Sequence, residues 1–143
     1  MTPAADPAQV VASARAWIGT PFHHQASLQG VGCDCLGLVR GVWRDVVGRE
    51  AFNVPAYSLD WGESNAREVL RDGFAAHMHA VDGEALPGDL LLFRMRTWAI
   101  AKHAGVLVDA NTMVHAHSRL GVIEERVTPA WWRRAAFVFR FPD

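Results

Sequence analysis

Two cysteines separated by one residue, Cys33 and Cys35, lie in a glycine-rich stretch that leads into a segment of helical periodicity. Cys35 falls in the expected first turn of that helix, where unpaired amide groups and the helix dipole favour negative charge. Both effects stabilise a thiolate, so we expect a lowered pKa for Cys35 and a nucleophilic sulfur. A disulfide between the two cysteines would close a very tight ring, which favours reduced thiols or metal ligands instead.

A cysteine nucleophile needs a base within hydrogen-bond reach and a group that orients that base. Among the seven histidines, His103 begins an expected strand and His115 lies on the next one, beyond a turn at residues 109–111. An antiparallel pair centred on residue 109 would bring His103 and His115 opposite each other. His117 lies two residues further on the same strand face and is the alternative orienting group.

The elements that position these residues follow from apolar spacing and from start and stop signals. Helices are expected over 7–18, 35–47 and 65–77, the first beginning at Asp6-Pro7 and the third capped by Ser64. Strands are expected over 90–93, 103–108, 112–117, 122–126 and 135–141. Helices that precede antiparallel strands indicate an α+β fold. Its nucleophile helix would pack on the C-terminal sheet, in a single domain over residues 1–143.

The composition excludes several classes of function. A net charge of −1 and a pI near 6.6 give no electrostatic reason to expect nucleic acid or an anionic membrane as a partner. The sequence contains no apolar run long enough to cross a bilayer, so no membrane insertion is expected. The first residues lack the basic and apolar regions of a Sec signal peptide, so we expect synthesis in the cytoplasm without that export route.

Five short motifs occur in the order found in the cell-wall cysteine peptidases of the NlpC type, which have a minimal papain-like fold. They are Gly-Thr-Pro-Phe at 19–22, Gly-Cys-Asp-Cys-Leu-Gly at 32–37, Pro-Gly-Asp-Leu at 87–90, His-Ala-Gly-Val at 103–106 and His-Ala at 115–116. The sequence therefore resembles this family over roughly residues 8–117. The form of the motif at 32–37 is most similar to the phage-type members found in tails and gene transfer agents.

The resemblance implies that Cys35 is the nucleophile, His103 the general base and His115 the third polar residue. It implies hydrolysis of peptidoglycan stem peptides, commonly between D-γ-glutamate and the diamino acid, without a cofactor. It further implies tail or baseplate proteins of a phage-like particle as partners. The protein would then be associated with a virion or particle and act in the periplasm or cell wall.

The substrate-binding residues implied by the resemblance depart from the family pattern at two positions. Phe22 replaces a tyrosine and Leu36 replaces a serine, while Asp34 is retained. All three positions help to bind the start of the stem peptide in the family. The loop before Cys35 is about one residue longer than usual, which would let His23 or His24 reach into the cleft.

Two other functions fit the same residues. Cys33, Cys35, His103 and His115 could together bind zinc, although Cys-x-Cys is tighter than the usual ligand spacing. Alternatively, the chain could be a structural tail component that keeps the fold without turnover, which Phe22 in place of tyrosine and Leu36 in place of serine would favour.

Overall fold

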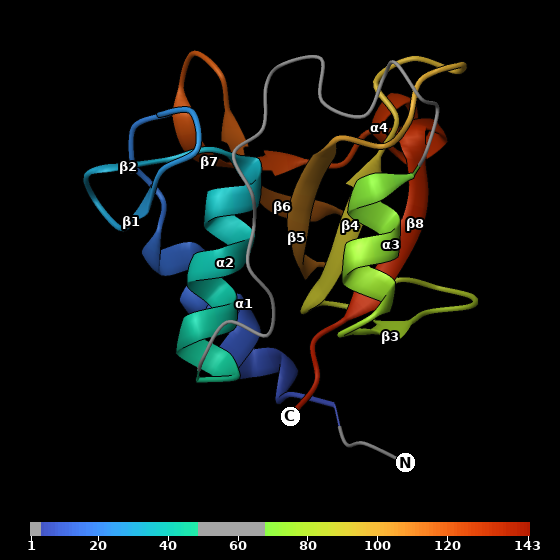
Figure 1. Cartoon of the computed structure of the whole chain (residues 1–143), viewed down its shortest axis with the longest axis horizontal. Coiled ribbons are helices and arrows are strands. Elements are labelled where there is room, and N and C mark those ends of the chain that lie inside the picture. Colours follow the sequence, from blue (N-terminus) through green and yellow to red (C-terminus); the bar gives the residue numbers. More distant parts are fainter. Residues whose placement is uncertain (1–3, 49–67) are drawn as a thin grey trace.

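The computed structural model describes residues 4–48 and 68–143, in which helices lead and a larger sheet follows (Figure 1). The described helices are α1 (Pro7–Ala16), α2 (Cys35–Val46), α3 (Val69–Ala75) and α4 (Pro129–Arg134). The described strands are β1 (Ser27–Leu28), β2 (Gly32–Cys33), β3 (His79–Ala80), β4 (Asp89–Phe93), β5 (His103–Asp109), β6 (Thr112–His117), β7 (Gly121–Arg126) and β8 (Ala135–Arg140). None of the described helices is both long and apolar enough to cross a membrane.

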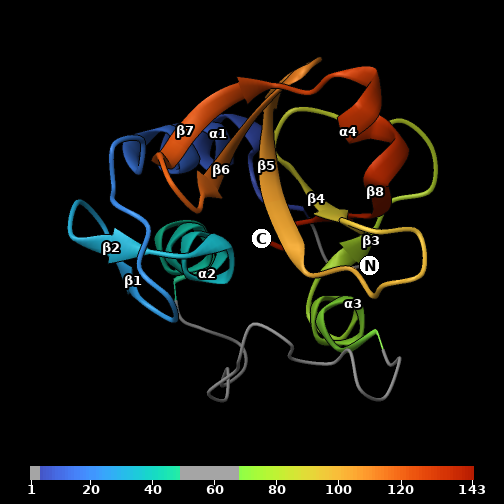
Figure 2. The same cartoon turned by 90° about the horizontal axis from the view of Figure 1, so that it is seen from above.

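Six of these strands form one antiparallel sheet in the order β3-β8-β4-β5-β6-β7. Strands β4 to β7 follow one another as hairpins, whereas β8 returns from the end of the chain and inserts between β3 and β4. Strands β1 and β2 form a separate small ribbon beside α2 (Figure 2). The sequence predicted the five longer strands, and the α+β class is confirmed.

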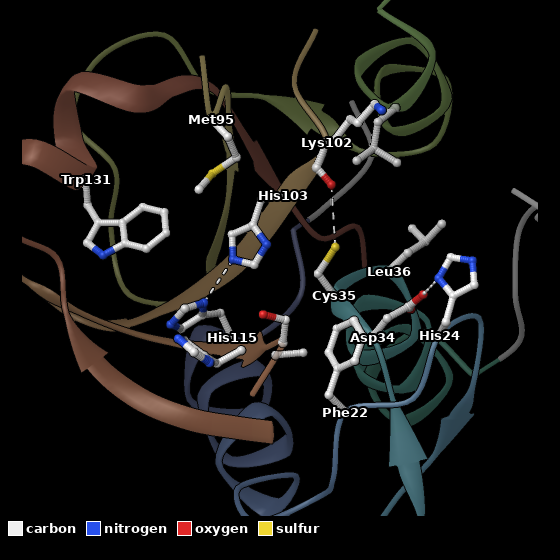
Figure 3. A pocket seen from close by; sticks show the side chains of 14 residues that line it. Phe22, His24, Asp34, Cys35, Leu36, Met95, Lys102, His103, His115 and Trp131 are labelled. Atoms are coloured by element: carbon white, nitrogen blue, oxygen red, sulfur yellow. Dashed lines mark hydrogen bonds and ion pairs between the residues drawn. The ribbon is translucent and has the colours of Figure 1, made fainter. Parts of the chain in front are cut away.

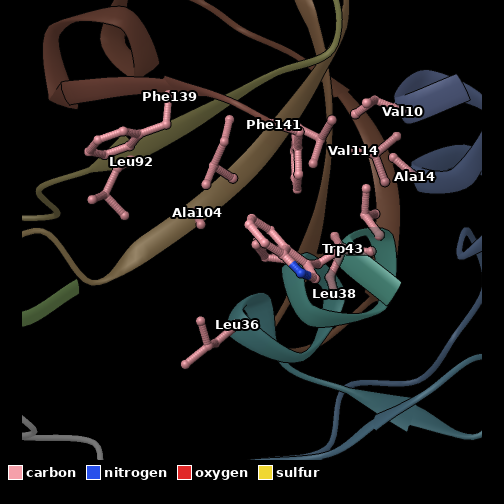
Figure 4. Close-up of a cluster of buried hydrophobic side chains, with 14 of the residues drawn as sticks. Val10, Ala14, Leu36, Leu38, Trp43, Leu92, Ala104, Val114, Phe139 and Phe141 are labelled. Atoms are coloured by element: carbon pink, nitrogen blue, oxygen red, sulfur yellow. The ribbon is translucent and has the colours of Figure 1, made fainter. Parts of the chain in front are cut away.

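Helices α2 and α4 lie on opposite sides of β5, so the sheet is covered on both faces (Figure 2). The larger core joins α1, α2 and α3 to one face of the sheet, with side chains such as Val10, Leu38 and Phe139 fully or almost fully buried (Figure 4). A smaller cluster around Phe93 and Leu107 fills the other face beneath α4. Burial on both faces explains why β4 and β5 are apolar throughout rather than alternating.

An aspartate starts each of the first two helices, and Asp6 was the expected start of the first. Asp6 accepts a hydrogen bond from Ala8 N, and the Asp34 Oδ1 atom accepts one from Gly37 N, so α2 begins at Cys35. Two expectations were wrong in detail. The first helix was expected to run to residue 18, but α1 ends at Ala16, and Ile18 is 45% exposed.

The third helix begins at Val69 rather than residue 65, and the expected cap Ser64 lies outside the described residues. Its N-cap is Glu68, whose side chain makes no capping hydrogen bond to the helix. Glu68 Oε1 accepts a hydrogen bond from Arg94 Nη2, and Oε2 accepts one from Ala101 N. Glu68 therefore fastens both ends of the connection between β4 and β5.

Two glycines allow α2 to approach its neighbours closely. A Cβ at Gly41 would lie 1.9 Å from the ring of Trp17, and one at Gly37 would lie 1.8 Å from the carbonyl oxygen of Ala26. The contact at Gly37 holds the loop that precedes Cys35 against the first turn of α2. These glycines thus fix the position of the helix terminus relative to the loop beside it.

Candidate active site

Cys35 is the first residue of α2 and faces the start of β5 (Figure 3). Its Sγ atom donates a hydrogen bond of 3.5 Å to the carbonyl oxygen of Lys102, the residue immediately before His103. Cys35 is partly exposed, whereas Cys33 is completely buried in the core. Of the two cysteines, only Cys35 is therefore open to a substrate.

His103 and His115 are in direct contact, with 2.9 Å between His103 Nε2 and His115 Nδ1. The strand register differs from the simple turn expected from the sequence. His115 pairs with Gly105, because a bulge between Leu107 and Asp109 shifts the hairpin. The imidazole of His115 therefore reaches His103 diagonally across the sheet. The glycine makes this possible, since a Cβ at residue 105 would lie 3.3 Å from His115 Cβ and 2.9 Å from Met113 Sδ.

A carboxylate that the sequence interpretation missed continues this chain of contacts. Glu125 Oε1 lies 2.6 Å from His115 Nε2, and Trp131 Nε1 donates a weak hydrogen bond of 3.5 Å to Glu125 Oε2. The Trp131 ring also stacks on His103, with ring centroids 5.8 Å apart. Alternation along β7 was the available signal, because it places Glu125 on the same face as the buried Val127.

The contacts determine where the protons lie. An ionised carboxylate only accepts hydrogen bonds, so His115 must donate through Nε2 to Glu125. A neutral His115 then accepts at Nδ1, which requires His103 to donate through Nε2. The other nitrogen of His103, Nδ1, faces Cys35 in Figure 3 and carries a lone pair. In this arrangement His103 can accept the thiol proton.

Burial sets the charge state of the resting site. Burial, reinforced by the negative charge of Asp34, raises the pKa of the Cys35 thiol to about 12, although the backbone amides of Ala104, Leu36 and Cys35 act in the opposite direction. Burial and the nearby His115 lower the pKa of His103 to about 3. The expectation of a lowered thiol pKa was wrong, because desolvation outweighs the helix terminus. At neutral pH the pair is a thiol and a neutral imidazole.

This charge state predicts how the thiols react with iodoacetamide. We expect Cys35 to be modified before Cys33, because Cys33 is inaccessible to solvent. Since only the thiolate reacts, the rate at Cys35 should rise by about tenfold per pH unit between pH 7 and 9. Mass spectrometry of wild type and Cys35→Ala would assign the label. A rate that is already constant below pH 7 would instead indicate a thiolate–imidazolium pair.

Cys35 and both histidines line a cavity of about 380 Å³. Phe22, Asp34 and Leu36, predicted to bind substrate, line the same cavity. His23 does not line it; the loop turns His24 toward the cavity instead, with His24 Nδ1 lying 3.8 Å from Asp34 Oδ2 (Figure 3). The lining is mainly apolar, which follows from phenylalanine and leucine at positions where hydroxyl groups were expected.

Two polar residues near the site are already engaged in hydrogen bonds. Besides capping α2, Asp34 accepts a hydrogen bond of 2.7 Å from Gln25 N, so the carboxylate also fixes the loop before the helix. His117 Nδ1 accepts hydrogen bonds from Arg119 N and Leu120 N in the following turn. The structure thus places His115, and not the alternative His117, against His103.

The zinc alternative requires Cys33 and Cys35 to converge with the histidines. Cys33 instead lies in the hydrophobic core, where it pairs with Ser27 in the small ribbon. Over residues 4–48 and 68–143, no three His, Cys, Asp or Glu side chains converge so that they could hold a metal ion. The described side chains therefore lack the ligand geometry that this alternative needs.

A cysteine at a helix terminus that faces histidines on an antiparallel sheet defines a papain-like α+β protein. Residues 19–141 match the sequence profile of the NlpC/P60 family, and the chain belongs to this family. It is 28% identical over 118 residues to the murein DD-endopeptidase MepS/murein LD-carboxypeptidase of Escherichia coli strain K12, covering 82% of this chain and 53% of that protein. The chain thus spans about half the length of MepS.

Further similarities lie within the same family. The probable endopeptidase NlpC of Escherichia coli strain K12 is 26% identical over 120 residues, covering 84% of this chain and 68% of that protein. The NlpC/p60 domain of the peptidoglycan hydrolase SagA has a similar fold, with a TM-score of 0.65, 22% identity, and coverage of 94% of this chain and 97% of that one. An NlpC/P60 family protein of Bacillus cereus ATCC 10987 gives a TM-score of 0.67 and 18% identity over 99% of this chain and 42% of that one.

Proposed function

We propose that this protein is a cysteine endopeptidase that hydrolyses peptide bonds in peptidoglycan stem peptides. The observation that carries the proposal is that Cys35 lines an apolar cavity together with His103 and His115, and that a series of contacts joins His103 to His115 and His115 to Glu125. Membership of a family whose relatives include a murein endopeptidase and a probable endopeptidase supports the substrate class.

The proposed reaction begins with a neutral pair. As Cys35 Sγ attacks the peptide carbonyl, its proton moves to His103 Nδ1, and the amide nitrogen of Cys35 binds the developing oxyanion. The imidazolium of His103 then gives this proton to the leaving amine, and a thioester remains. Water attacks the thioester while His103 accepts its proton, which releases the carboxylic acid and restores the thiol.

The charge that develops on His103 is costly in a buried site. His115 lowers this cost because it accepts the hydrogen bond from His103 Nε2 and is itself bound to the Glu125 carboxylate. Trp131 covers both imidazole rings and excludes water from one side. In this proposal His103 transfers the proton, while His115 and Glu125 orient the imidazole ring of His103.

The bond that we propose for cleavage is the one between D-γ-glutamate and the diamino acid. The Asp34 carboxylate, which also accepts hydrogen bonds from Gly37 N and Gln25 N, lies at one end of the cavity and would attract the amino terminus of a short stem peptide. Phe22 and Leu36 offer apolar contacts beside it. Incubation of the purified protein with synthetic stem peptides, followed by mass spectrometry, tests this. Release of the dipeptide L-alanyl-D-glutamate is expected. Cleavage at another bond would overturn the bond assignment. The absence of cleavage in every stem peptide would overturn the proposal that the protein is an endopeptidase.

The setting that we propose is a phage-like tail or gene transfer agent particle that penetrates a cell wall, with the protein acting in the periplasm or wall. The support is the resemblance of the segment 32–37 to phage-type members. Tail or baseplate proteins would be its partners. Purified particles probed with an antibody against the chain test this: co-sedimentation with tail proteins is expected, and its absence from particles would overturn the setting.

One observation favours a second candidate, a structural component without turnover. The Cys35 thiol donates to the Lys102 carbonyl rather than to His103, which is a resting contact and not the reacting one. In such a component, Cys35 would be alkylated but no stem peptide would be cleaved. The same digest therefore separates the two candidates.

A further inference from the structure

A second and larger hollow adjoins the candidate active site. It has a volume of about 870 Å³ and lies between residues 94–98, on the β4–β5 connection, and residues 133–136, at the end of α4. The two walls are joined, because Arg94 N donates a hydrogen bond of 2.8 Å to the Arg134 carbonyl. We name this hollow the arginine groove after the four arginines that line it: Arg94, Arg96, Arg133 and Arg134.

The arginines of the groove differ in how they are used. Arg94 is held by Glu68 and lies over the ring of Phe137. Arg96, Arg133 and Arg134 are exposed, and within the described part of the chain no ion pair engages them. The net charge of the chain is −1, but three such guanidinium groups on one hollow give that surface a local preference for anions.

Apolar surface accompanies this charge. Trp98, at the tip of the same connection, is 82% exposed, and Met95 beside it is 48% exposed. Exposed tryptophan next to unpaired arginine is the composition of a surface that buries an amphipathic ligand rather than of a solvated loop. The groove is therefore built for a ligand with carboxylates and an apolar body.

The groove continues from the catalytic cavity. Met95 lines both hollows, and Trp131 of the cavity precedes Arg133 of the groove by two residues on α4. In Figure 3, Phe22 and Asp34 lie on one side of Cys35, whereas Met95 and Trp131 lie beyond His103 on the other. A chain that crosses the cavity from Asp34 past His103 thus leaves it toward the arginines.

This direction matches the polarity of a peptide. The Asp34 end has a carboxylate that suits an amino terminus, and the groove has guanidinium groups that suit carboxylates toward the carboxyl terminus. A cysteine peptidase retains the amino-terminal part as thioester and releases the carboxyl-terminal part. The groove therefore lies where the leaving part of the substrate passes.

We propose that the arginine groove binds the carboxylates of the leaving part, and that it selects stem peptides whose diamino acid carries a free side-chain carboxylate. This rests on the proposed function. Arg96, Arg133 and Arg134 bind the carboxylates, and Trp98 covers the aliphatic chain of the diamino acid. A stem peptide with meso-diaminopimelate is thus preferred over one with lysine, which lacks that carboxylate.

The kinetic test uses two synthetic stem peptides that differ only in diaminopimelate or lysine. For Arg133→Gln/Arg134→Gln we expect KM to rise about 10- to 100-fold for the diaminopimelate peptide, the range of charge-assisted hydrogen bonds, with kcat nearly unchanged. KM for the lysine peptide, which keeps its C-terminal carboxylate but lacks the side-chain one, should rise by a clearly smaller factor, at least about threefold less. Arg15→Gln/Arg119→Gln removes the same charge elsewhere and should change neither value. Equal effects on both peptides, or no effect, would overturn the proposal.

A binding test separates failure of the groove from failure of the proposed function. Cys35→Ala binds peptide without cleaving it, and the fluorescence difference between Cys35→Ala and Cys35→Ala/Trp98→Phe reports Trp98 alone. Quenching by the diaminopimelate peptide at lower concentration than by the lysine peptide supports the groove even if the wild type cleaves nothing. If the wild type hydrolyses stem peptides but Trp98 responds equally to both peptides, the proposed role of the groove is refuted while the proposed enzyme activity stands. A Trp98 response to a phosphodiester polymer instead of the diaminopimelate peptide would have the same meaning.

Discussion

Cys35→Ala is expected to lower stem-peptide hydrolysis by more than about 1000-fold, because it removes the only thiol that faces the cavity. The fold should survive, since Cys35 is a partly exposed residue in the first turn of α2. Release of the dipeptide product, measured by mass spectrometry under single-turnover conditions, gives the rate. Circular dichroism and thermal unfolding check that the variant is folded.

Cys33→Ala is the matched control for this experiment. Cys33 is buried in the core, so its loss should reduce the free energy of unfolding by about 1 kcal/mol while hydrolysis stays within about threefold of wild type. The result that contradicts the assignment is the reverse pattern, in which Cys33→Ala stops hydrolysis of the folded protein and Cys35→Ala does not. Equal losses with intact folding would point to a metal held by both sulfurs.

Glu125→Gln is expected to lower kcat by about 100-fold with little change in KM, although Glu125 does not line the cavity. The glutamine amide must satisfy two neighbours. Trp131 Nε1 only donates, so the amide oxygen turns to Trp131 and the amide NH₂ group turns to His115. His115 must then accept at Nε2 and donate at Nδ1. This reverses the proton arrangement, and His103 would carry its hydrogen on the nitrogen that faces Cys35.

Glu124→Gln is the control on the neighbouring residue. Glu124 pairs with the exposed Arg15, a contact of small energetic value, so its loss should change kcat by less than about twofold. Nitrogen-15 spectra of labelled histidines distinguish positioning from a general loss of stability, because they report the tautomer of His115 directly. Unchanged His115 signals together with a kcat equal to that of Glu124→Gln would refute the positioning role.

Local signals in the sequence predicted much of this fold because they act over a few residues. Asp6-Pro7 marks the start of the first helix, and the apolar spacing that follows Cys35 marks the second, whereas glycine and proline mark the ends of strands. The contacts within the active site were harder to predict, because they depend on the register in which neighbouring strands pair. The bulge beyond Leu107 pairs His115 with Gly105, and on β7 His115 pairs with Ile123, so both His103 and Glu125 reach it diagonally.

Electrostatics were not predictable from local pattern alone. A cysteine at a helix N-terminus suggests a thiolate, but the sequence does not reveal how far the fold shields Cys35 and His103 from water. The structure shows that burial raises the pKa of one and lowers the pKa of the other. The arginine groove could not be predicted for a related reason. Arg96 and Arg134 are far apart in the sequence, and the insertion of β8 beside β4 brings their segments together.

The carboxylate of Glu68 has a consequence for how this protein can diversify. By binding Arg94 at one end and Ala101 at the other, it clamps the β4–β5 connection at its base. The tip, with Met95 and Trp98, can then be exchanged without displacing Lys102 or His103. The residues that choose the substrate can thereby change independently of those that carry out the reaction. Replacing the tip of this connection is therefore a route to new substrate preferences with unaltered catalytic residues.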